Sequence, residues 1–516
     1  MAGRGSAARE RLAGWPKGWI GGALVVLLLA LGAIGLRLPT WHDGTGAENL
    51  EASYHVVLTM EALDRTPARE HLFLPIVSLG QPRDKHIAWG AAVANPVGDQ
   101  IYTSFFPAGF VLPYAALKAV GAEFTLRNLA LFNVMLGTVS ALLFFLLAWR
   151  AAELLVPQGR YNRANAVLAT LPLLLSTQAL QSTGLVYWHQ CATQLVLSGM
   201  GLALLALLTG RRGAGPVLVM LAFVGPLFEW SALIANGTLV LVLALPGLTA
   251  SPRRALAGAV ALATAASLAL TFAQFTAGIG LDNFVQALVA RFGARSAAAV
   301  GGGSLVAGYF RSFGLFLIML VLAVRPAWAR LRQRDPAAVA VLAVVIVLTG
   351  ACAENLLLSQ HAAQFAFDRF KLALPLGLIL LVALGQWQGR TRTGMAALVV
   401  VAALGGIAGW YAALRADAGW AQVHARNLAL RGRIDGLVDR RCALFASNGP
   451  VRGQTNLWLM RGVHEAVSPE GFRTLAGPRP PCGAVYLHGT PFRADLIGYA
   501  SADVLAASGR RFTVTP

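Results

Sequence analysis

Long apolar runs separated by short polar segments dominate the chain from Trp19 to Leu414. The hydrocarbon core of a bilayer is about 30 Å thick, and an α-helix needs roughly 20 residues to cross it. Eleven runs approach this length: 19–36, 128–149, 164–183, 188–209, 215–230, 233–249, 255–275, 309–325, 337–356, 370–387 and 394–414. We therefore predict an all-α polytopic membrane bundle of eleven transmembrane helices over residues 1–414.

The composition supports this fold class. Of 516 residues, 56% are hydrophobic and 13% are charged, and the mean hydropathy is +0.61. A water-soluble domain of this size would not have such a composition. The formal charge of +19 would suggest nucleic acid as the partner of a soluble protein. In a membrane protein its distribution along the chain matters more, and we predict membrane lipids, not nucleic acid, as partners.

Basic residues are concentrated in alternate polar segments. If the N-terminus is cytoplasmic, the segments on that side carry 17 basic residues against three acidic ones, in agreement with the positive-inside rule. A crossing by the apolar segment Ser104–Val120 would invert every later loop. We therefore interpret residues 104–120 as a re-entrant or juxtamembrane helix. The sequence thus predicts a multi-pass protein of the inner (plasma) membrane.

Three polar segments then lie on the outer face: a first loop at 37–101, a second loop at 276–308, and a tail at 415–516. The tail changes in composition and is predicted to be a small extracytoplasmic α/β domain. Its helical patterns are Trp420–Asp439 and Arg493–Ala507, and its apolar strands are Ala443–Ala446, Ala484–Leu487 and Phe512–Val514. Cys442 and Cys482 precede two of these strands, which suits either a disulfide in an oxidising compartment or two free thiols.

Ionisable side chains near the apolar runs fall at the outward ends of those runs, at His189, Glu229, Glu354, His361, Arg369 and Lys371. Polar groups within a membrane domain are costly and commonly functional. Their position on one side favours an outward-facing site over a path through the membrane. Snorkelling and pairing at helix ends is the alternative interpretation.

Three short motifs occur in this framework. They are Asp43 in His42-Asp43-Gly44, Tyr102-Thr103-Ser104-Phe105-Phe106-Pro107, and Asp368-Arg369-Phe370-Lys371 followed by Pro375. Together with the order of spans, loops and tail, they resemble the GT-C superfamily of membrane glycosyltransferases. The similarity is greatest to the branch of the bacterial aminoarabinose transferase and the protein O-mannosyltransferases. Asp43 lacks the adjacent glutamate that is common in that family, and the nearest glutamate is Glu48.

The resemblance implies transfer of a sugar from a polyprenyl-phosphate donor to a glycan, lipid or protein acceptor. Such a reaction needs a carboxylate that takes the acceptor proton and cations that stabilise the departing phosphate. Asp43 is the first candidate for the base and Glu48 the second, although Asp43 could instead cap a helix over Ala47–Leu63. His42 could orient the site.

The candidate cations for the donor phosphate are Arg369 and Lys371, at the entry of the tenth span, and Arg291 and Arg295. The last two are spaced i, i+4 on the amphipathic stretch Leu281–Ala294 and so share a helix face. A generic lipid-facing surface is the alternative interpretation for this pair. Tyr102, Phe105 and Phe106 could line an acceptor groove, although aromatic residues are also ordinary interface anchors.

No ligand spacing for a metal is recognisable around His42, Asp84 and His86, so a divalent metal is left open and no other cofactor is predicted. No nucleotide-binding signature is present, which favours a lipid-linked donor. The predicted function is a membrane glycosyltransferase. The alternative is a lipid or polysaccharide transporter, or a polymer ligase, of similar architecture.

Overall fold

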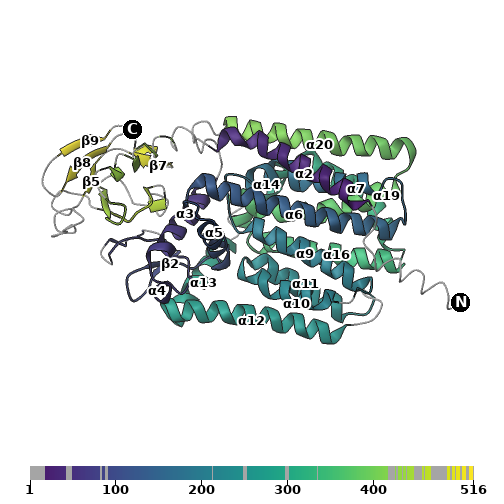
Figure 1. Cartoon of the computed structure of the whole chain (residues 1–516), viewed down its shortest axis with the longest axis horizontal. Coiled ribbons are helices and arrows are strands. Elements are labelled where there is room, and N and C mark those ends of the chain that lie inside the picture. Colours follow the sequence, from purple (N-terminus) through teal and green to yellow (C-terminus); the bar gives the residue numbers. More distant parts are fainter. Residues whose placement is uncertain are drawn as a thin grey trace.

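The computed structural model describes residues 18–41, 49–81, 84, 85, 87, 91–211, 213–247, 253–296, 302–333 and 335–416, together with shorter stretches between 425 and 514. Most of these residues form helices that lie side by side along the length of the molecule (Figure 1). The long helices are α2 (Trp19–Arg37), α6 (Leu126–Leu155), α7 (Asn162–Leu175), α9 (Gln190–Leu208), α10 (Ala214–Val224), α11 (Trp230–Ala244), α12 (Arg254–Ile279), α15 (Leu315–Leu331), α16 (Pro336–Cys352), α19 (Ala373–Gln386) and α20 (Gly389–Ala416).

All eleven predicted spans coincide with helical segments of this bundle. Within the described residues, six helices are long and apolar enough to cross a membrane unaided. A seventh crossing results if α14 (Gly302–Phe313) and α15, which meet at 98°, act as one broken span. The chain is therefore an integral membrane protein, and the count of eleven spans stays a prediction.

Side-chain caps determine where several helices begin. The Oγ1 atom of Thr125 accepts a hydrogen bond from the Asn128 amide, 3.2 Å away, at the start of α6. Asp335 accepts from the amides of Ala337 and Ala338, and Pro336 occupies the first position of α16. These residues provide partners for amides that have none within the helix itself.

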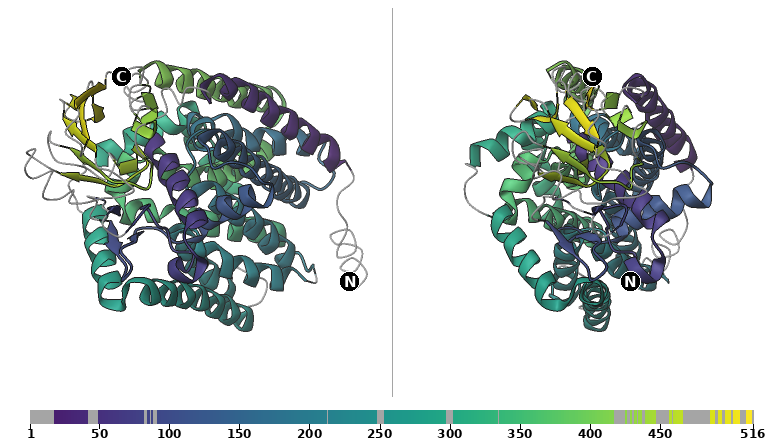
Figure 2. Two further views of the ribbon diagram at one scale, coloured as in Figure 1. Left: turned by 60° about the vertical axis from the view of Figure 1, so that its left-hand side comes forward. Right: turned by 90° about the vertical axis from the view of Figure 1, so that its left-hand side faces the viewer.

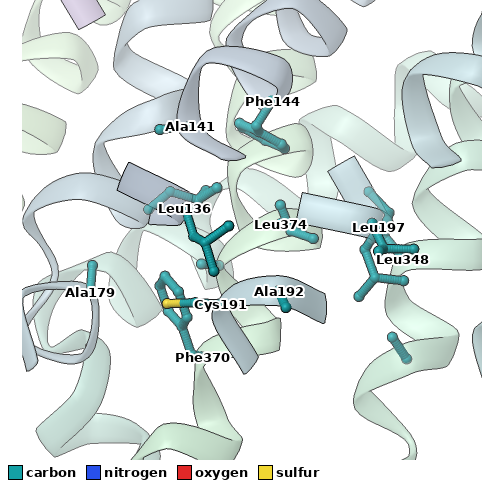
Figure 3. Packing of buried hydrophobic residues seen from close by; sticks show 14 of the residues in the cluster. Leu136, Ala141, Phe144, Ala179, Cys191, Ala192, Leu197, Leu348, Phe370 and Leu374 are labelled. Carbon is teal, nitrogen blue, oxygen red and sulfur yellow. The ribbon is translucent and has the colours of Figure 1, made fainter. Parts of the chain in front are cut away.

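The core of the bundle is built from leucine, alanine and phenylalanine. Figure 3 shows Leu136 and Phe144 of α6 with Leu197 of α9 and Leu374 of α19 among these buried side chains. Glycine allows two close helix approaches. A Cβ on Gly377 of α19 would lie 2.4 Å from the Ala169 carbonyl oxygen, and one on Gly406 of α20 would lie 2.1 Å from that of Leu175. Small residues of this kind let membrane helices pack backbone against backbone.

Shorter elements gather at one end of the bundle (Figure 1). They are α3 (Leu50–Arg65), α4 (Ala68–His71), β1 (Ala92–Ala94), β2 (Gln100–Tyr102), α5 (Ala108–Ala119), α13 (Leu281–Ser296), α17 (Glu354–Leu357), α18 (Ser359–Gln364) and the 3-10 helix η4 (Ala366–Leu372). Helix α5 has 12 residues. At a rise of 1.5 Å per residue it is roughly 18 Å long, too short to cross a bilayer. This length agrees with the interpretation of 104–120 as a segment that does not span.

The tail contains a mixed five-stranded sheet with the order β4-β3-β5-β8-β9, and Figure 2 shows these strands at the same end of the molecule as α3. The strands are β3 (Leu444–Ala446), β4 (Val463–Glu465), β5 (Val485–His488), β8 (Ala502–Ala506) and β9 (Arg511–Val514). Strand β3 is parallel to β4 and β5, whereas β8 is antiparallel to β5 and β9. The three predicted strands correspond to β3, β5 and β9.

The helix predicted over Arg493–Ala507 is wrong. This stretch contains β7 (Leu496–Tyr499), which pairs with β6 (Pro491–Arg493), and β8. Val504 of β8 lies opposite Leu487 on one side and Phe512 on the other. A helix here would leave the edges of both neighbouring strands unpaired, and pairing them outweighs the local helical pattern.

Two further features of the tail remain predictions. The helix predicted over Trp420–Asp439 falls largely on residues outside the described part of the chain, so the α/β character of the domain stays a prediction. Cys442 is disulfide-bonded. Its predicted partner, Cys482, lies outside the described residues, so the pairing of these two cysteines remains a prediction.

Polar contacts hold the beginning of the tail against the first loop. Arg440 forms an ion pair with Glu61 of α3, with 3.1 Å between the Nη1 and Oε1 atoms. The Ala443 amide donates to Oδ1 of Asp84 at 3.2 Å. Leu457 is buried in the same hydrophobic core as the membrane helices. The tail therefore contributes to the end of the molecule where the short elements gather.

Candidate active site

Hydrogen bonds connect the first loop to the segment between α8 (Thr177–Ser182) and α9. The Ser53 hydroxyl of α3 donates to the Leu185 carbonyl and accepts from the Tyr187 amide, both at 2.8 Å. The Tyr187 hydroxyl donates to the Gly109 carbonyl of α5 at 2.7 Å. A Cβ on Gly109 would lie 2.5 Å from the His189 ring, so only glycine permits this approach. These contacts fix α3 and α5 over the first turn of α9.

The hairpin of β1 and β2 places Tyr102 beside this segment. The Tyr102 amide donates to the Pro75 carbonyl at 2.9 Å. Its ring meets the edge of His55 with 4.5 Å between centroids, and it lies 6.4 Å from the rings of Phe105 and Trp188. Aromatic rings at such separations attract one another through their edges and faces. The result is a rigid aromatic wall made from α3, β2 and the start of α9.

A pocket of about 280 Å³ adjoins this wall, and we call it the polar pocket. Its polar lining residues come from three helices and from the hairpin. They are Glu51 and His55 of α3, Tyr102 of β2, Arg291 and Arg295 of α13, and Gln360, His361 and Gln364 of α18; Trp188, Phe365, Phe367 and Leu457 are among the others. Leu457 belongs to the tail, so the tail forms part of the pocket wall.

A second pocket, of about 540 Å³, is lined almost entirely by apolar side chains, and we call it the apolar pocket. A cavity of this size matches the range of ligand sites. Its residues are Trp230, Leu233, Ile234, Leu288, Val289, Phe292, Gly293, Leu357 and Leu358, with Ser104, Arg291, Arg295 and Glu354. The predicted groove residue Phe106 lies behind it, with its ring 4.5 Å from that of Trp230.

Arg291 and Arg295 border both pockets, as expected for two side chains on one helix face. The Nε atom of Arg291 donates to the Ser104 hydroxyl at 2.9 Å, and burial lowers the pKa of Arg291. Arg295 is 5% exposed and lies over the Phe105 ring, 4.8 Å from its centroid. Among the described residues it has no hydrogen-bond or ion-pair partner, and its Nε is buried without one. A buried guanidinium in this state calls for an anion.

Behind the pockets, six buried side chains form one continuous hydrogen-bonded chain. Gln190 is its centre, because its Nε2 atom donates to Asp368 at 2.6 Å and to Glu229 at 2.7 Å. Asp368 also accepts from Nδ1 of His361. Lys371 pairs with Glu229 at 3.4 Å and with Glu354. All six are at most 4% exposed. Their pairing supports the helix-end interpretation and excludes snorkelling.

The ends of this chain lie at different pockets. His361 borders the polar pocket and Glu354 borders the apolar pocket. Burial lowers the pKa of His361 below its ordinary value, despite the neighbouring Asp368 carboxylate. Burial alone would raise the pKa of Asp368, but His361, Lys371 and Arg295 together lower it. The pair is therefore a neutral imidazole hydrogen-bonded to an ionised carboxylate.

Arg369 and Lys371, predicted to bind the donor phosphate, border neither pocket. Arg369 donates from Nε to the Ser312 hydroxyl at 2.8 Å and from Nη1 to the Ala362 carbonyl at 2.7 Å. Lys371 is engaged by Glu229 and Glu354. Arg369 therefore ties η4 to α18 and to Ser312 of α14, and Lys371 ties η4 to Glu229 and to α17.

His42, Asp43 and Glu48 lie outside the described residues. The described ends of that segment are Trp41, which is buried, and Asn49, whose Oδ1 accepts from the Ala366 amide of η4 at 3.2 Å. Within the described residues, no group of three histidine, cysteine, aspartate or glutamate side chains is placed to hold a metal ion.

The sequence analysis missed Glu51, His55 and Trp188. One signal could have identified two of them, because Glu51 and His55 are spaced i, i+4 on a stretch whose other residues are mostly apolar, and so project from one helix face. Trp188 had no such signal. It reaches the pocket through the irregular turn before α9.

No protein-family model matches the sequence, and no curated protein matches it. Solved structures do. ArnT from Cupriavidus metallidurans bound to undecaprenyl phosphate superimposes with a TM-score of 0.58 over 90% of this chain and 93% of the ArnT chain, at 13% sequence identity. The two proteins share a fold. ArnT in the apo state gives a TM-score of 0.55 at 12% identity, over 90% of this chain and 92% of that one.

The shared fold covers 90% of this chain. The resemblance to GT-C membrane glycosyltransferases, inferred from three short motifs and the order of spans, is confirmed at the level of fold.

Proposed function

We propose that this chain is a membrane glycosyltransferase that moves a sugar from a polyprenyl-phosphate donor to a glycan, lipid or protein acceptor at the outer face of the inner membrane. One observation carries this proposal. Arg295 is a buried guanidinium without an anionic partner among the described residues, and it lies between an apolar pocket and a polar one. A phosphate bound there would have its lipid chain on one side and its sugar on the other.

The apolar pocket suits the isoprenoid chain. Its lining of leucine, valine, phenylalanine and tryptophan offers no hydrogen-bond specificity, as a hydrocarbon requires. The ArnT structure with undecaprenyl phosphate supports a ligand of this class on the same fold. Arg291 and Arg295 would hold the phosphate, since guanidinium groups bind its oxygens in pairs.

The polar pocket suits the sugar. Glu51, Gln360 and Gln364 offer oxygens and amides to hydroxyl groups, and Tyr102 and Trp188 offer faces to a sugar ring. During transfer the acceptor oxygen bonds to the anomeric carbon while the bond from that carbon to the phosphate oxygen breaks. The electron pair stays on the phosphate, where the two arginines stabilise the developing charge.

The acceptor must also lose its proton. The carboxylate that we propose from the resemblance is Asp43, with Glu48 as the second candidate. Asp43 follows the first predicted span in the sequence, which suits a position at the level of a lipid headgroup.

The test is sugar transfer by the purified chain in detergent, with a panel of synthetic polyprenyl-phosphate monosaccharides as donors and envelope lipids and glycans as acceptors. We expect release of polyprenyl phosphate with at least one donor and a large loss of rate in Asp43→Asn. Full activity of Asp43→Asn would remove Asp43 from the mechanism. Transport of an intact lipid-linked sugar across proteoliposomes, without transfer from any donor, would favour the transporter alternative.

A further inference from the structure

A histidine–aspartate pair at the polar pocket has no role in the proposal so far. His361 of α18 borders the pocket, and its Nδ1 atom is hydrogen-bonded to Oδ2 of Asp368 in η4. The two side chains are 4% and 3% exposed. Because Nδ1 is occupied, Nε2 is the ring nitrogen left for a molecule in the pocket.

The surrounding hydrogen bonds fix the proton on this pair. The Nε2 atom of Gln190 contacts carboxylate oxygens of both Asp368 and Glu229. The opposite orientation of the amide would place its oxygen against two carboxylates, which repel it. Gln190 therefore donates, and both oxygens of Asp368 accept. Asp368 is ionised, Nδ1 of His361 carries the proton, and Nε2 has a free lone pair.

Gln190 also limits how far a proton can travel. An amide nitrogen that donates to two carboxylates has no lone pair with which to accept a proton. The rest of the buried chain can therefore hold Asp368 in position but cannot accept a proton from it. This part consists of Glu229, Lys371 and Glu354. A proton taken up at His361 stays there until it passes to a molecule in the pocket.

Charges on every neighbouring element act on this imidazole. Burial keeps it neutral near pH 7, while Asp368 stabilises the imidazolium once it forms. The charged and titratable groups around it are Asp368, Arg369 and Lys371 of η4, Arg291 and Arg295 of α13, Glu51 and His55 of α3, Glu354 of α17, His189 before α9, Tyr102 of β2 and the exposed Arg311 of α14.

We propose that His361, oriented by Asp368, is a proton acceptor of the transfer reaction. This inference rests on the proposed function, and it puts His361 in place of Asp43 as the group that receives the acceptor's proton. As the acceptor oxygen bonds to the anomeric carbon, its O–H proton moves to Nε2 of His361 while the phosphate departs with its electron pair. The imidazolium then gives the proton to that phosphate, held by Arg291 and Arg295 at the same pocket, and the neutral pair is restored.

The experiment measures kcat and kcat/KM between pH 5 and 8, with the donor that supports the highest wild-type rate. The variants are His361→Gln, Asp368→Asn and Asp43→Asn. His71→Gln is the control, since His71 is a buried histidine that borders neither pocket. We expect His361→Gln to lower kcat by about 100-fold or more.

The pH profile separates catalysis from support of the fold. The wild-type rate should fall below about pH 6.5, where a histidine of ordinary or lowered pKa becomes protonated. His361→Gln should lose this acidic limb. Asp368→Asn should shift the limb to lower pH, because the imidazolium loses its carboxylate. His71→Gln should keep the wild-type rate and limb.

Wild-type rate and acidic limb in His361→Gln would overturn the inference, and so would a limb that disappears only in Asp43→Asn. If His361→Gln fails to yield monodisperse protein, the pH–rate profile of Asp368→Asn tests the inference instead. An acidic limb at the same pH as in the wild type would overturn the assignment of His361. A wild-type enzyme that transfers from no lipid donor would instead overturn the proposed function.

Discussion

Arg295 lies with its guanidinium 4.8 Å from the centroid of the Phe105 ring, and the described residues give it no hydrogen-bond or ion-pair partner. The contact holds the charge without using its five hydrogen-bond donors. The side chain lies at the boundary between the polar and apolar pockets, and its Nε–H is buried without a partner. The arrangement is consistent with the anion site of the proposed function.

Replacement of Arg295 by alanine should lower kcat for sugar transfer by about 100-fold, because a donor aimed at developing charge is lost. Arg295→Lys should recover only part of the rate, since an ammonium group cannot bind two phosphate oxygens as a planar fork. The measurement is steady-state transfer from the polyprenyl-phosphate donor. The matched control is Arg254→Ala, an exposed arginine at the start of α12. Equal losses in both alanine variants would contradict an anion site at Arg295.

Removal of the charge of Lys371 should destabilise the fold strongly. Lys371→Met would leave Glu229 and Glu354 buried beside each other without their common cation. Breaking such a pair costs about 3–5 kcal/mol. We expect a lower unfolding temperature in detergent, followed by intrinsic tryptophan fluorescence.

A double variant tests the cause of that loss. Adding Glu354→Gln to Lys371→Met removes one of the two stranded charges and should recover part of the unfolding temperature. A double variant less stable than Lys371→Met would show that the lysine acts through packing and not through charge.

Stability should fall on acidification. His55 is buried among Tyr102, Phe110 and Trp188, and burial holds its pKa well below the ordinary value. In the unfolded chain the same histidine binds a proton below about pH 6.5. The unfolded state then binds more protons than the folded state, so the free energy of unfolding is intact above that pH and falls below it. The slope is up to about 1.4 kcal/mol per pH unit for each such histidine.

The variant His55→Phe keeps a ring in this cluster and removes the titration. Its unfolding temperature should therefore decline less than that of the wild type between pH 7 and 5. A residual decline is expected, because burial also lowers the pKa of His71 and of His361. Identical declines in wild type and variant would mean that His55 is not among the groups responsible.

Close packing of α19 on α7 should make Gly377 intolerant of a side chain. Gly377→Ala would bring a Cβ to 2.4 Å from the Ala169 carbonyl oxygen and force the helices apart. Overpacking of this kind costs about 1–3 kcal/mol. The control is Gly35→Ala in α2, where a Cβ meets nothing within 4 Å. Both variants are compared by unfolding temperature, and equal values would contradict the close approach.

Local patterns in the sequence determined the parts of this protein that depend on neighbouring residues. Long apolar runs specify helices, because a bilayer leaves no other way to satisfy backbone hydrogen bonds within one segment. The i, i+4 spacing put Arg291 and Arg295 on one face, and both do border the same pockets. The tail was harder. The pattern at Arg493–Ala507 fits a helix, but residues Ala502–Ala506 form strand β8 because they pair with β5 and β9.

Only the tertiary structure decided how the site is assembled. Gln190 meets Asp368 across 178 positions of sequence, and Lys371 meets Glu229 across 142. No local periodicity encodes such pairings, because they depend on which helices the bundle makes neighbours. The sequence therefore supplied the charged residues at the ends of the helices. The packing of the helices determined that Arg369 and Lys371 bind other buried side chains and backbone carbonyls, while Arg295 and His361 border the pockets.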